Sequence, residues 1–314
     1  MSHVIPGIHH ITAICGPAQA NVDFYVGILG QRLVKRTVNF DDPGTYHLYY
    51  GDESGTPGSI LTFFPFEGAD RGEVGAGMAS AFAYAVPEAG FEAVRDALTR
   101  SGIRVSETVQ RFGEPTFAID DPDGLHVEFV QTGTAAAPPA TPRQAGFHSV
   151  TLSIANPEKT ARLLTDIFGY GEVGEEATAG EVRLRFAAAG GGRASVVDLV
   201  RPGERRHGIQ GTGTVHHVAF RAETDAIQRD WRERLLEAGF HVTEVIDRQY
   251  FNAIYFREPG GVLFEIATDP PGFAADEPAE TMGAALMLPP RYERLRAEIE
   301  DTLPPLTVPD RAPA

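Results

Sequence analysis

The chain has 314 residues, 42% of them apolar and 34 of them glycine, which is typical of a soluble globular protein with about two domains. Asp and Glu number 43 against 27 Lys and Arg, and the formal net charge of −16 argues against binding the phosphate backbone of a nucleic acid. The single Cys15 excludes an internal disulfide, and without a signal-peptide pattern or an apolar run of roughly 18 residues we expect a cytoplasmic protein that does not enter a membrane.

The first expected element is a short buried strand at residues 7–14, GIHHITAI, which carries an adjacent pair of histidines. A second pair stands in a similar strand at residues 214–220, TVHHVAF. Side chains of a strand alternate between its two faces. We therefore expect His9 and His10 to point opposite ways, and likewise the second pair, so that at most one histidine of each pair faces a given pocket.

The two strands begin copies of an internal repeat. Residues 7–30 and 146–169 align without a gap, each as an apolar strand followed by a helix-like stretch that a glycine ends. Further copies begin at 80–86, SAFAYAV, and at the second histidine pair, which gives a period of about 70 residues. Alternating runs such as RLVKRTV, TYHLYYG and EVRLRFAA supply three more strands per copy. The sequence thus predicts an α+β fold of four βαβββ modules.

Two copies also end alike. Residues 120–130, DDPDGLHVEFV, and 257–267, REPGGVLFEIA, each have a Pro/Gly turn followed by a strand with a glutamate, Glu128 or Glu265. The corresponding strands of the other two copies, GSILTFFPF and ASVVDLV, have no matching glutamate. Glu128 and Glu265 are therefore the glutamate candidates at this strand position.

We expect two domains of two modules each, at residues 1–132 and 146–268. A Thr/Ala/Pro-rich linker at 133–145 joins them. Residues 269–314 are expected to form an extension with one short amphipathic helix, in LPPRYERLRAEIEDTLPPL.

Two imidazoles and one carboxylate on one face suit a divalent metal and leave some of its coordination positions open. The adjacent copies 3 and 4 would offer His148, His217 and Glu265. The gapless alignment, however, sets His148 opposite His9. By strand alternation His148 is then expected on the face away from a site that contains His217.

Other pairs of copies can be judged in the same way. Copies 1 and 2 offer His10 and Glu128 without a second histidine, whereas copies 1 and 4 offer the complete set His10, His217 and Glu265. We therefore expect copy 1 to pack against copy 4, with their first strands in one concave sheet. This predicts that His10 and His217 lie within roughly 10 Å, because both would reach one metal at about 2.1 Å.

The remaining candidates have a simpler interpretation. An isolated histidine on an apolar strand is more often a hydrogen-bonded core residue, and this is the interpretation given to His9, His148 and His216. Glu128 is expected to cap a vestigial site or to form an ion pair at the surface.

Taken together, the sequence resembles the vicinal oxygen chelate (glyoxalase/bleomycin-resistance/extradiol dioxygenase) superfamily and, more narrowly, its hydroquinone-type ring-cleaving dioxygenases. The stretches GIHHITAICGPAQANVDFYVGILG, GTGTVHHVAF and LPPRYERLRAEIEDTLPPL carry the resemblance, which covers nearly the whole chain. It implies two curved mixed β-sheets with helices outside, and an enzyme that uses Fe(II), or sometimes Mn(II), to open a hydroquinone or catechol ring with O2. It places the metal ligands at His10, His217 and Glu265, with His9 and His216 in the second sphere.

The resemblance also implies further site residues. A tyrosine ten residues before the ligand glutamate and an arginine seventeen before it correspond to Tyr255 and Arg248. Tyr255 is expected to donate a hydrogen bond to a bound phenolate or to stabilise an oxygenated intermediate, and Arg248 to hold a substrate oxygen or to orient Tyr255. Thr12 shares a face with His10 and is expected to line the same pocket. On the residues alone, Tyr255 and Arg248 are ordinary strand residues.

Two functions of other classes stay open. A glyoxalase-like isomerase or lyase would typically need more carboxylate at the metal, and copy 1 lacks a glutamate on its last strand. A metal-free protein that sequesters small molecules would have no use for two histidines and a glutamate on one face. The expected partners are a small aromatic substrate and O2, and the sequence leaves a homo-oligomer open.

Overall fold

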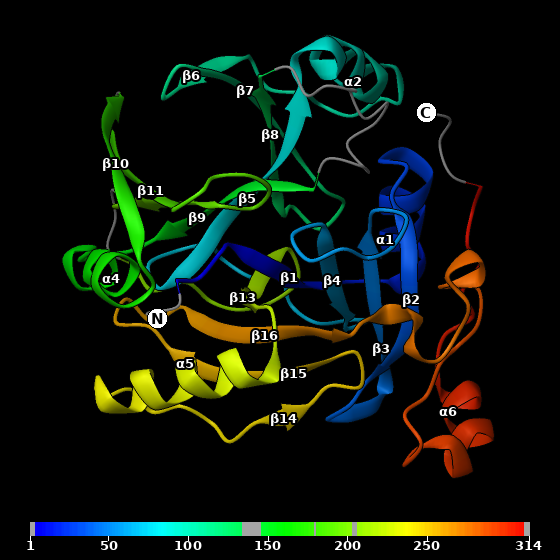
Figure 1. The fold of residues 1–314 in the computed structure, drawn as a ribbon. Helices are drawn as coiled ribbons and strands as arrows, with labels where there is room; N and C mark the ends of the chain where they lie inside the picture. Colours follow the sequence, from blue (N-terminus) through cyan, green and yellow to red (C-terminus); the bar gives the residue numbers. More distant parts are fainter. Residues whose placement is uncertain (1–3, 134–145, 179, 203–205, 311–314) are drawn as a thin grey trace.

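The computed structural model of the protein describes residues 4–133, 146–178, 180–202 and 206–310 (Figure 1). Over these residues the chain forms four βαβββ modules and two curved, mixed, eight-stranded sheets, with five α-helices around them. The predicted α+β fold of four modules is confirmed.

The modules follow one another along the chain. Module 1 consists of β1 (Ile8–Cys15), α1 (Ala18–Val22), the π-helix η1 (Asp23–Ile28), β2 (Arg32–Asn39), β3 (Asp42–Gly51) and β4 (Ile60–Pro65). Module 2 consists of β5 (Met78–Pro87), α2 (Glu88–Arg100), β6 (Val109–Arg111), β7 (Glu114–Asp120) and β8 (His126–Thr132). Module 3 consists of β9 (Phe147–Ser153), α4 (Glu158–Arg162), the π-helix η2 (Leu163–Ile167), β10 (Tyr170–Thr178), β11 (Glu181–Ala188) and β12 (Val196–Val200). Module 4 consists of β13 (Thr214–Ala222), α5 (Asp225–Glu237), β14 (Ile246–Asp247), β15 (Phe251–Arg257) and β16 (Leu263–Pro271).

Each sheet takes its strands from two modules. The 1–4 sheet has the order β14-β15-β16-β13-β1-β4-β3-β2, and the 2–3 sheet has the order β10-β11-β12-β9-β5-β8-β7-β6. The first strands of the two modules are antiparallel neighbours at the centre, β1 with β13 and β5 with β9. Module 1 therefore packs against module 4, as predicted. The division into domains at 132 and 146 stays a prediction, and all but the first residue of the expected linker lies outside the described residues.

The central strands are apolar because they are covered on both sides. Strand β1 is buried at all eight positions. Helix α5 shows how the outer layer forms: Thr224 caps it by accepting a hydrogen bond from the Ile227 amide, and Trp231 and Leu235, four residues apart, are buried on one helix face. Gln228 on that face donates to two strand carbonyls, which ties the helix to β15 and β16.

The C-terminal extension covers the outer edge of module 1. It contains the short helices η3 (Phe273–Ala275), η4 (Ala279–Thr281), η5 (Glu293–Leu295) and α6 (Arg296–Thr302), the last of which is the predicted helix. A bridge between Arg36 and Leu286 pairs the extension with β2, and α6 lies beside β3 (Figure 1). The buried Lys35 ammonium lies 2.7 Å from Asp276 and 2.5 Å from Glu277. None of the helices in the described part of the chain is long and apolar enough to cross a membrane.

Candidate metal centre

The strands of the 1–4 sheet enclose a cavity of about 320 Å³. Its wall is contributed by modules 1 and 4 and includes polar side chains on β1, β13 and β16 together with aromatic rings. The lining residues are His10, Thr12, Asn39, Phe40, Asp41, His47, Tyr49, Phe64, Phe66, His216, His217, Thr243, Arg248, Phe251, Tyr255, Leu263 and Glu265. A cavity of this size is at the small end of the range for ligand pockets, roughly 300–1,000 Å³.

The three expected ligands meet in this cavity. His10 and His217 place their Nε2 atoms 3.4 and 2.9 Å from Oε2 of Glu265. The two imidazole centroids are 5.6 Å apart, well inside the predicted limit, and one ligand atom from each of the three residues lies within 4.8 Å of the others. All three side chains are buried.

Strand register brings these residues together. Thr12 of β1 is opposite His217 of β13, and His10, two residues before Thr12, is opposite Ala219. Ala219 of β13 is opposite Glu265 of the parallel strand β16. The ligands thus come from three neighbouring strands at the junction of two modules.

The Glu265 carboxylate supports a metal between these side chains. Both of its oxygens are buried, and neither has a hydrogen-bond partner in the described part of the chain. A buried carboxylate without donors is costly unless a cation balances its charge. Burial lowers the pKa of His217, which keeps that imidazole neutral near pH 7. The balancing charge is therefore not an imidazolium at His217, and a divalent cation bound by the three ligand atoms would supply it.

The pKa of Glu265 is consistent with this need for a cation. Burial raises the pKa of its carboxyl, but the contacts with His10 and His217 outweigh burial and hold the pKa well below its usual value. The carboxylate is thus ionised throughout the neutral range and available as a ligand.

In each pair, the histidine that does not face Glu265 contacts the one that does. Nδ1 of His9 lies 2.9 Å from Nδ1 of His10, and Nδ1 of His216 lies 2.7 Å from Nδ1 of His217. With Nε2 of His10 and of His217 facing Glu265, these contacts give the other ring nitrogen of each a hydrogen-bond partner. This arrangement agrees with the second-sphere placement of His9 and His216.

The expectation that the members of each pair point opposite ways was wrong. His216 and His217 both line the cavity, and the rings of His9 and His10 are in edge contact at 5.1 Å. The reason is a β-bulge in each strand: between β1 and β13 the register shifts by one residue at His9 and again at His216. An extra residue in one strand breaks the alternation of faces locally.

The two expected pocket residues of module 4 also lie at the site. Tyr255 of β15 is directly opposite Glu265 of β16. Its hydroxyl accepts a hydrogen bond from Nε of Arg248 at 3.2 Å, and the same guanidinium lies 3.0 Å from Asp41 of module 1. Burial raises the pKa of Tyr255 well above the usual value, and Glu265 adds to this effect. Tyr255 is thus a protonated phenol whose oxygen accepts from the Arg248 guanidinium.

Comparison with known proteins agrees with this geometry. The profile of the Glyoxalase/Bleomycin resistance protein/Dioxygenase superfamily matches residues 7–129 and 146–266. The chain belongs to this superfamily. The two matched segments cover all four βαβββ modules and end within β8 and β16, the strands that carry Glu128 and Glu265.

Full-length relatives within the superfamily carry more specific names. The chain is 50% identical over 309 residues to "Putative ring-cleaving dioxygenase MhqO" of Bacillus subtilis, with 96% of this chain and 97% of that protein covered. It is 34% identical over 315 residues to "Chlorohydroquinone/hydroquinone 1,2-dioxygenase" of Sphingobium indicum, with 95% and 96% covered. A crystal structure titled "putative dioxygenase" from Bacillus subtilis superposes with a TM-score of 0.91 at 47% identity, covering 98% of this chain and 99% of the other.

Module 1 contributes cavity residues that the sequence did not single out. His47 and Tyr49 of β3 line the cavity, and Asp41 reaches it from the turn before β3. Thr12 lines the cavity as predicted, and its hydroxyl accepts a hydrogen bond from Thr62 at 2.9 Å. The run TYHLYYG did carry a signal, since His47 and Tyr49 are two residues apart and must share a strand face.

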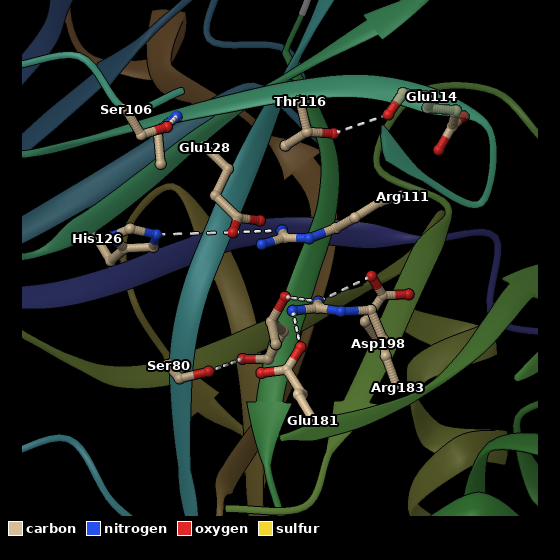
Figure 2. A network of polar contacts seen from close by, with 12 residues as sticks. Ser80, Ser106, Arg111, Glu114, Thr116, His126, Glu128, Glu181, Arg183 and Asp198 are labelled. Carbon is tan, nitrogen blue, oxygen red and sulfur yellow. Dashed lines mark hydrogen bonds and ion pairs between the residues drawn. The ribbon is translucent and has the colours of Figure 1, made fainter. Parts of the chain in front are cut away.

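The remaining histidine and glutamate candidates lie on the other sheet. His148 of β9 places its Nε2 3.3 Å from Glu114, and Glu128 of β8 is paired with Arg111 and contacts His126 (Figure 2). His148 is therefore not available to the cavity, which excludes the adjacent-copy ligand set. Glu128 forms a buried ion pair rather than one at the surface.

Proposed function

We propose that this protein is a ring-cleaving dioxygenase that holds Fe(II) through His10, His217 and Glu265 and opens a hydroquinone- or catechol-type ring with O2. The observation that carries the proposal is the buried Glu265 carboxylate, which faces the Nε2 atoms of two imidazoles and, over the described residues, has no hydrogen-bond partner. Its relatives named as dioxygenases span nearly the whole chain and support the same assignment.

When bound, the iron would supply adjacent open coordination positions and the one-electron chemistry that couples an aromatic ring to O2. Two imidazoles and one carboxylate are the donor set typical of that chemistry. Mn(II) is the alternative metal for this donor set.

The cavity fits a single aromatic ring. Phe64, Phe66 and Phe251 provide apolar faces around the ligand residues. Such faces can pack on a planar substrate and limit the access of water to the reacting oxygens.

Tyr255 would position the substrate. Because Arg248 donates to the Tyr255 oxygen, the phenol keeps its own hydrogen, which it can donate to an oxygen in the cavity. A donor beside Glu265 is placed to stabilise negative charge on a ring oxygen or on reduced dioxygen.

Strand register argues against the glyoxalase-like isomerase or lyase. In module 4, Ala219 is opposite Glu265; in module 1, the corresponding residue Thr12 is opposite Thr62. Thr62 thus occupies the position in module 1 at which a second carboxylate ligand would be needed. The neutral hydroxyl leaves that side of the site without a fourth protein ligand, as a substrate that binds the metal requires.

The test is to measure bound iron and O2 uptake with hydroquinone in protein loaded with Fe(II). We expect about one iron per chain and hydroquinone-dependent O2 consumption. Retained metal without O2 consumption would favour the isomerase or lyase. Hydroquinone binding by protein without metal would favour the sequestering protein. The cytoplasmic location and the homo-oligomer stay predictions.

A further inference from the structure

The half of the cavity that module 1 contributes mirrors the half that module 4 contributes. Tyr255 is opposite Glu265 in module 4, and Tyr49 is opposite Thr62 in module 1. Each half therefore has a tyrosine on the second strand out from the central pair β1 and β13, namely on β3 or on β15. In one half the tyrosine is next to a carboxylate, and in the other it is next to a hydroxyl.

A continuous chain of hydrogen bonds runs through the module 1 half. Tyr49 Oη lies 2.8 Å from Nδ1 of His47, and Nε2 of His47 lies 2.8 Å from Oγ1 of Thr62. Oγ1 of Thr62 donates to Oγ1 of Thr12 over 2.9 Å. Three members of this chain, Thr12, His47 and Tyr49, line the cavity.

The direction of the chain follows from counting hydrogens. Thr62 has one hydroxyl hydrogen, so in the direction in which it donates to Thr12 it accepts from Nε2–H of His47. Nδ1 of His47 is then unprotonated and accepts from the hydroxyl of Tyr49. The hydroxyl hydrogen of Thr12 is then the one hydrogen of this chain that is not donated within it.

The opposite direction would leave a buried phenol without an acceptor. In that case Nδ1–H of His47 would donate to Tyr49, which is only 1% exposed and packs its ring on Phe273 and Tyr250. No other hydrogen-bond acceptor for the Tyr49 hydroxyl is recorded within the described ranges. An unsatisfied buried donor of this kind is costly.

His47 is suited to hold this direction because it is neutral. Burial lowers its pKa well below the usual value, and His10, His217 and Arg248 lower it further. A neutral imidazole donates at one nitrogen and accepts at the other, which fixes the hydrogen positions on both sides of it.

We propose that His47 is a positioning residue of this site, which orients the hydroxyls of Thr62 and Thr12 so that Thr12 donates a hydrogen bond to a substrate oxygen in the cavity. The identity of that substrate, a dihydroxybenzene, rests on the proposed function. The direction of the chain does not. Tyr255 and Thr12 would then donate to the substrate from opposite halves of the cavity.

The first measurement is the tautomer of His47, read from imidazole nitrogen shifts by NMR of the full chain with diamagnetic Zn(II) in place of iron. The His47→Phe variant identifies the signals. We expect a neutral ring with hydrogen on Nε2. Hydrogen on Nδ1 would overturn the proposal, because Thr62 could then no longer donate to Thr12.

The second measurement is the affinity for hydroquinone without O2, in protein loaded with Fe(II). Thr62→Val keeps the shape of the side chain but interrupts the chain, and we expect a roughly 10-fold weaker affinity, the effect of one hydrogen bond of about 1.4 kcal/mol. Tyr49→Phe should act in the same direction, and Thr62→Ser should bind hydroquinone better than Thr62→Val.

Tyr50→Phe is the matched control. Tyr50 is the next residue on β3, and its hydroxyl donates to Asn21 in the core rather than to a cavity residue. It should lose similar stability without losing affinity. If Thr62→Val binds hydroquinone as tightly as Tyr50→Phe, the proposal is wrong.

The outcomes separate this proposal from the proposed function. If the parent protein neither binds hydroquinone nor consumes O2 with it, the proposed function fails. The tautomer of His47 then decides the direction of the chain by itself, with Nε2–H supporting it and Nδ1–H overturning it.

Discussion

The two sheets share a backbone plan but carry different chemistry on corresponding strands. Ala219 is opposite Glu265 in the 1–4 sheet, and Ala83 is opposite Glu128 in the 2–3 sheet. The positions that correspond to His217 and His10 are Ala81 and Ser149. The 2–3 sheet thus has a glutamate at the corresponding position but neither imidazole.

Even the bulges correspond. The register between β5 and β9 shifts by one residue at Ser80 and again at His148. These are the positions that correspond to His216 and His9 in the 1–4 sheet. Both pairs of modules therefore have bulges at the same strand positions. In the 1–4 sheet each bulge holds a histidine that contacts the next histidine along the chain, His10 or His217.

Arginines occupy the corresponding region of the 2–3 sheet (Figure 2). Arg183 of β11 pairs with Asp198 at 3.1 Å, and Arg111 pairs with Glu128. Arg185 of β11 pairs with Asp198 as well, at 2.8 Å. Arg185 is opposite Asp198 on the neighbouring strand, as Tyr49 is opposite Thr62 in the 1–4 sheet. Arg185 therefore corresponds to Tyr49, and Arg183, two residues earlier, corresponds to His47.

The comparison shows what a buried carboxylate requires in this fold. Burial raises the pKa of Glu128, but His126 and Arg111 more than compensate and lower it to about 2. Glu265 contacts two imidazoles, and no arginine of the described residues forms an ion pair with it. The same carboxylate position is balanced by a guanidinium in one sheet and faces two imidazoles, the proposed metal site, in the other.

The largest expected effect separates the two sheets by metal binding. His10→Ala, His217→Ala or Glu265→Ala should each abolish metal retention and turnover, because each removes a proposed ligand atom from the site. His148→Ala should keep its metal, because that residue contacts Glu114 on the other sheet. Metal content per chain checks both. If His148→Ala lost iron and His10→Ala retained it, the ligand set would be His148, His217 and Glu265 instead.

Next in size is the effect of removing the arginine beside Glu128. Arg111→Met should lower the free energy of unfolding by about 3–5 kcal/mol, because it breaks a buried ion pair and leaves His126 as the remaining partner of the Glu128 carboxylate, and metal content should stay the same. Denaturant unfolding of metal-free protein measures the change. Arg248→Met is the matched control, because Arg248 is the corresponding arginine of the 1–4 sheet. It precedes Tyr255, which is opposite Glu265, by seven residues, as Arg111 precedes Ala118, which is opposite Glu128. It should affect turnover more than stability.

Tyr255→Phe should slow turnover by about 10²–10³, or about 2.7–4 kcal/mol, because it removes the donor opposite Glu265. Iron content should be unchanged, and O2 uptake per bound iron is the measurement. Tyr250→Phe is the control, since its hydroxyl donates to Asp276 outside the cavity. A Tyr255→Phe rate within about threefold of the parent would make Tyr255 a packing residue.

The smallest effect concerns acid stability of the 2–3 sheet. Glu128 has a pKa of about 2 in the fold, below the value of 4.5 expected for the unfolded chain. A depressed folded pKa stabilises the fold above the unfolded pKa, and this contribution is lost as the pH falls from about 4.5 towards 2. Relative to Glu128→Gln, the parent should lose about 1 kcal/mol of stability between about pH 5 and pH 3.5. Equal slopes for the two proteins in unfolding experiments would contradict the assigned pKa.

Local sequence patterns determined the modules and named the three residues that converge. The repeat of strand, helix and three strands is visible in apolar periodicity, and periodicity reflects which side chains one element buries. The pairing of modules 1 and 4 was also predictable, because only that pair offers His10, His217 and Glu265 together.

The mirror relation between Tyr49 and Tyr255 was hidden in the sequence. Thirteen residues separate Tyr49 from Thr62, but ten separate Tyr255 from Glu265, so counting along the chain does not reveal the match. It appears only when each residue is found opposite its partner on the neighbouring strand. The arginines of β11 were hidden for a similar reason, because an alternating charged strand is normally exposed to solvent.

Tertiary structure alone decided which faces the paired histidines use. Alternation is a property of one strand and predicted that His9 and His10 diverge. The bulges that bring each pair together arise from the register between β1 and β13, whose residues are more than 200 positions apart along the chain. Periodicity is local and can be read from a sequence, whereas register depends on how distant strands pair, and it is the register that placed Nδ1 of His9 against Nδ1 of His10.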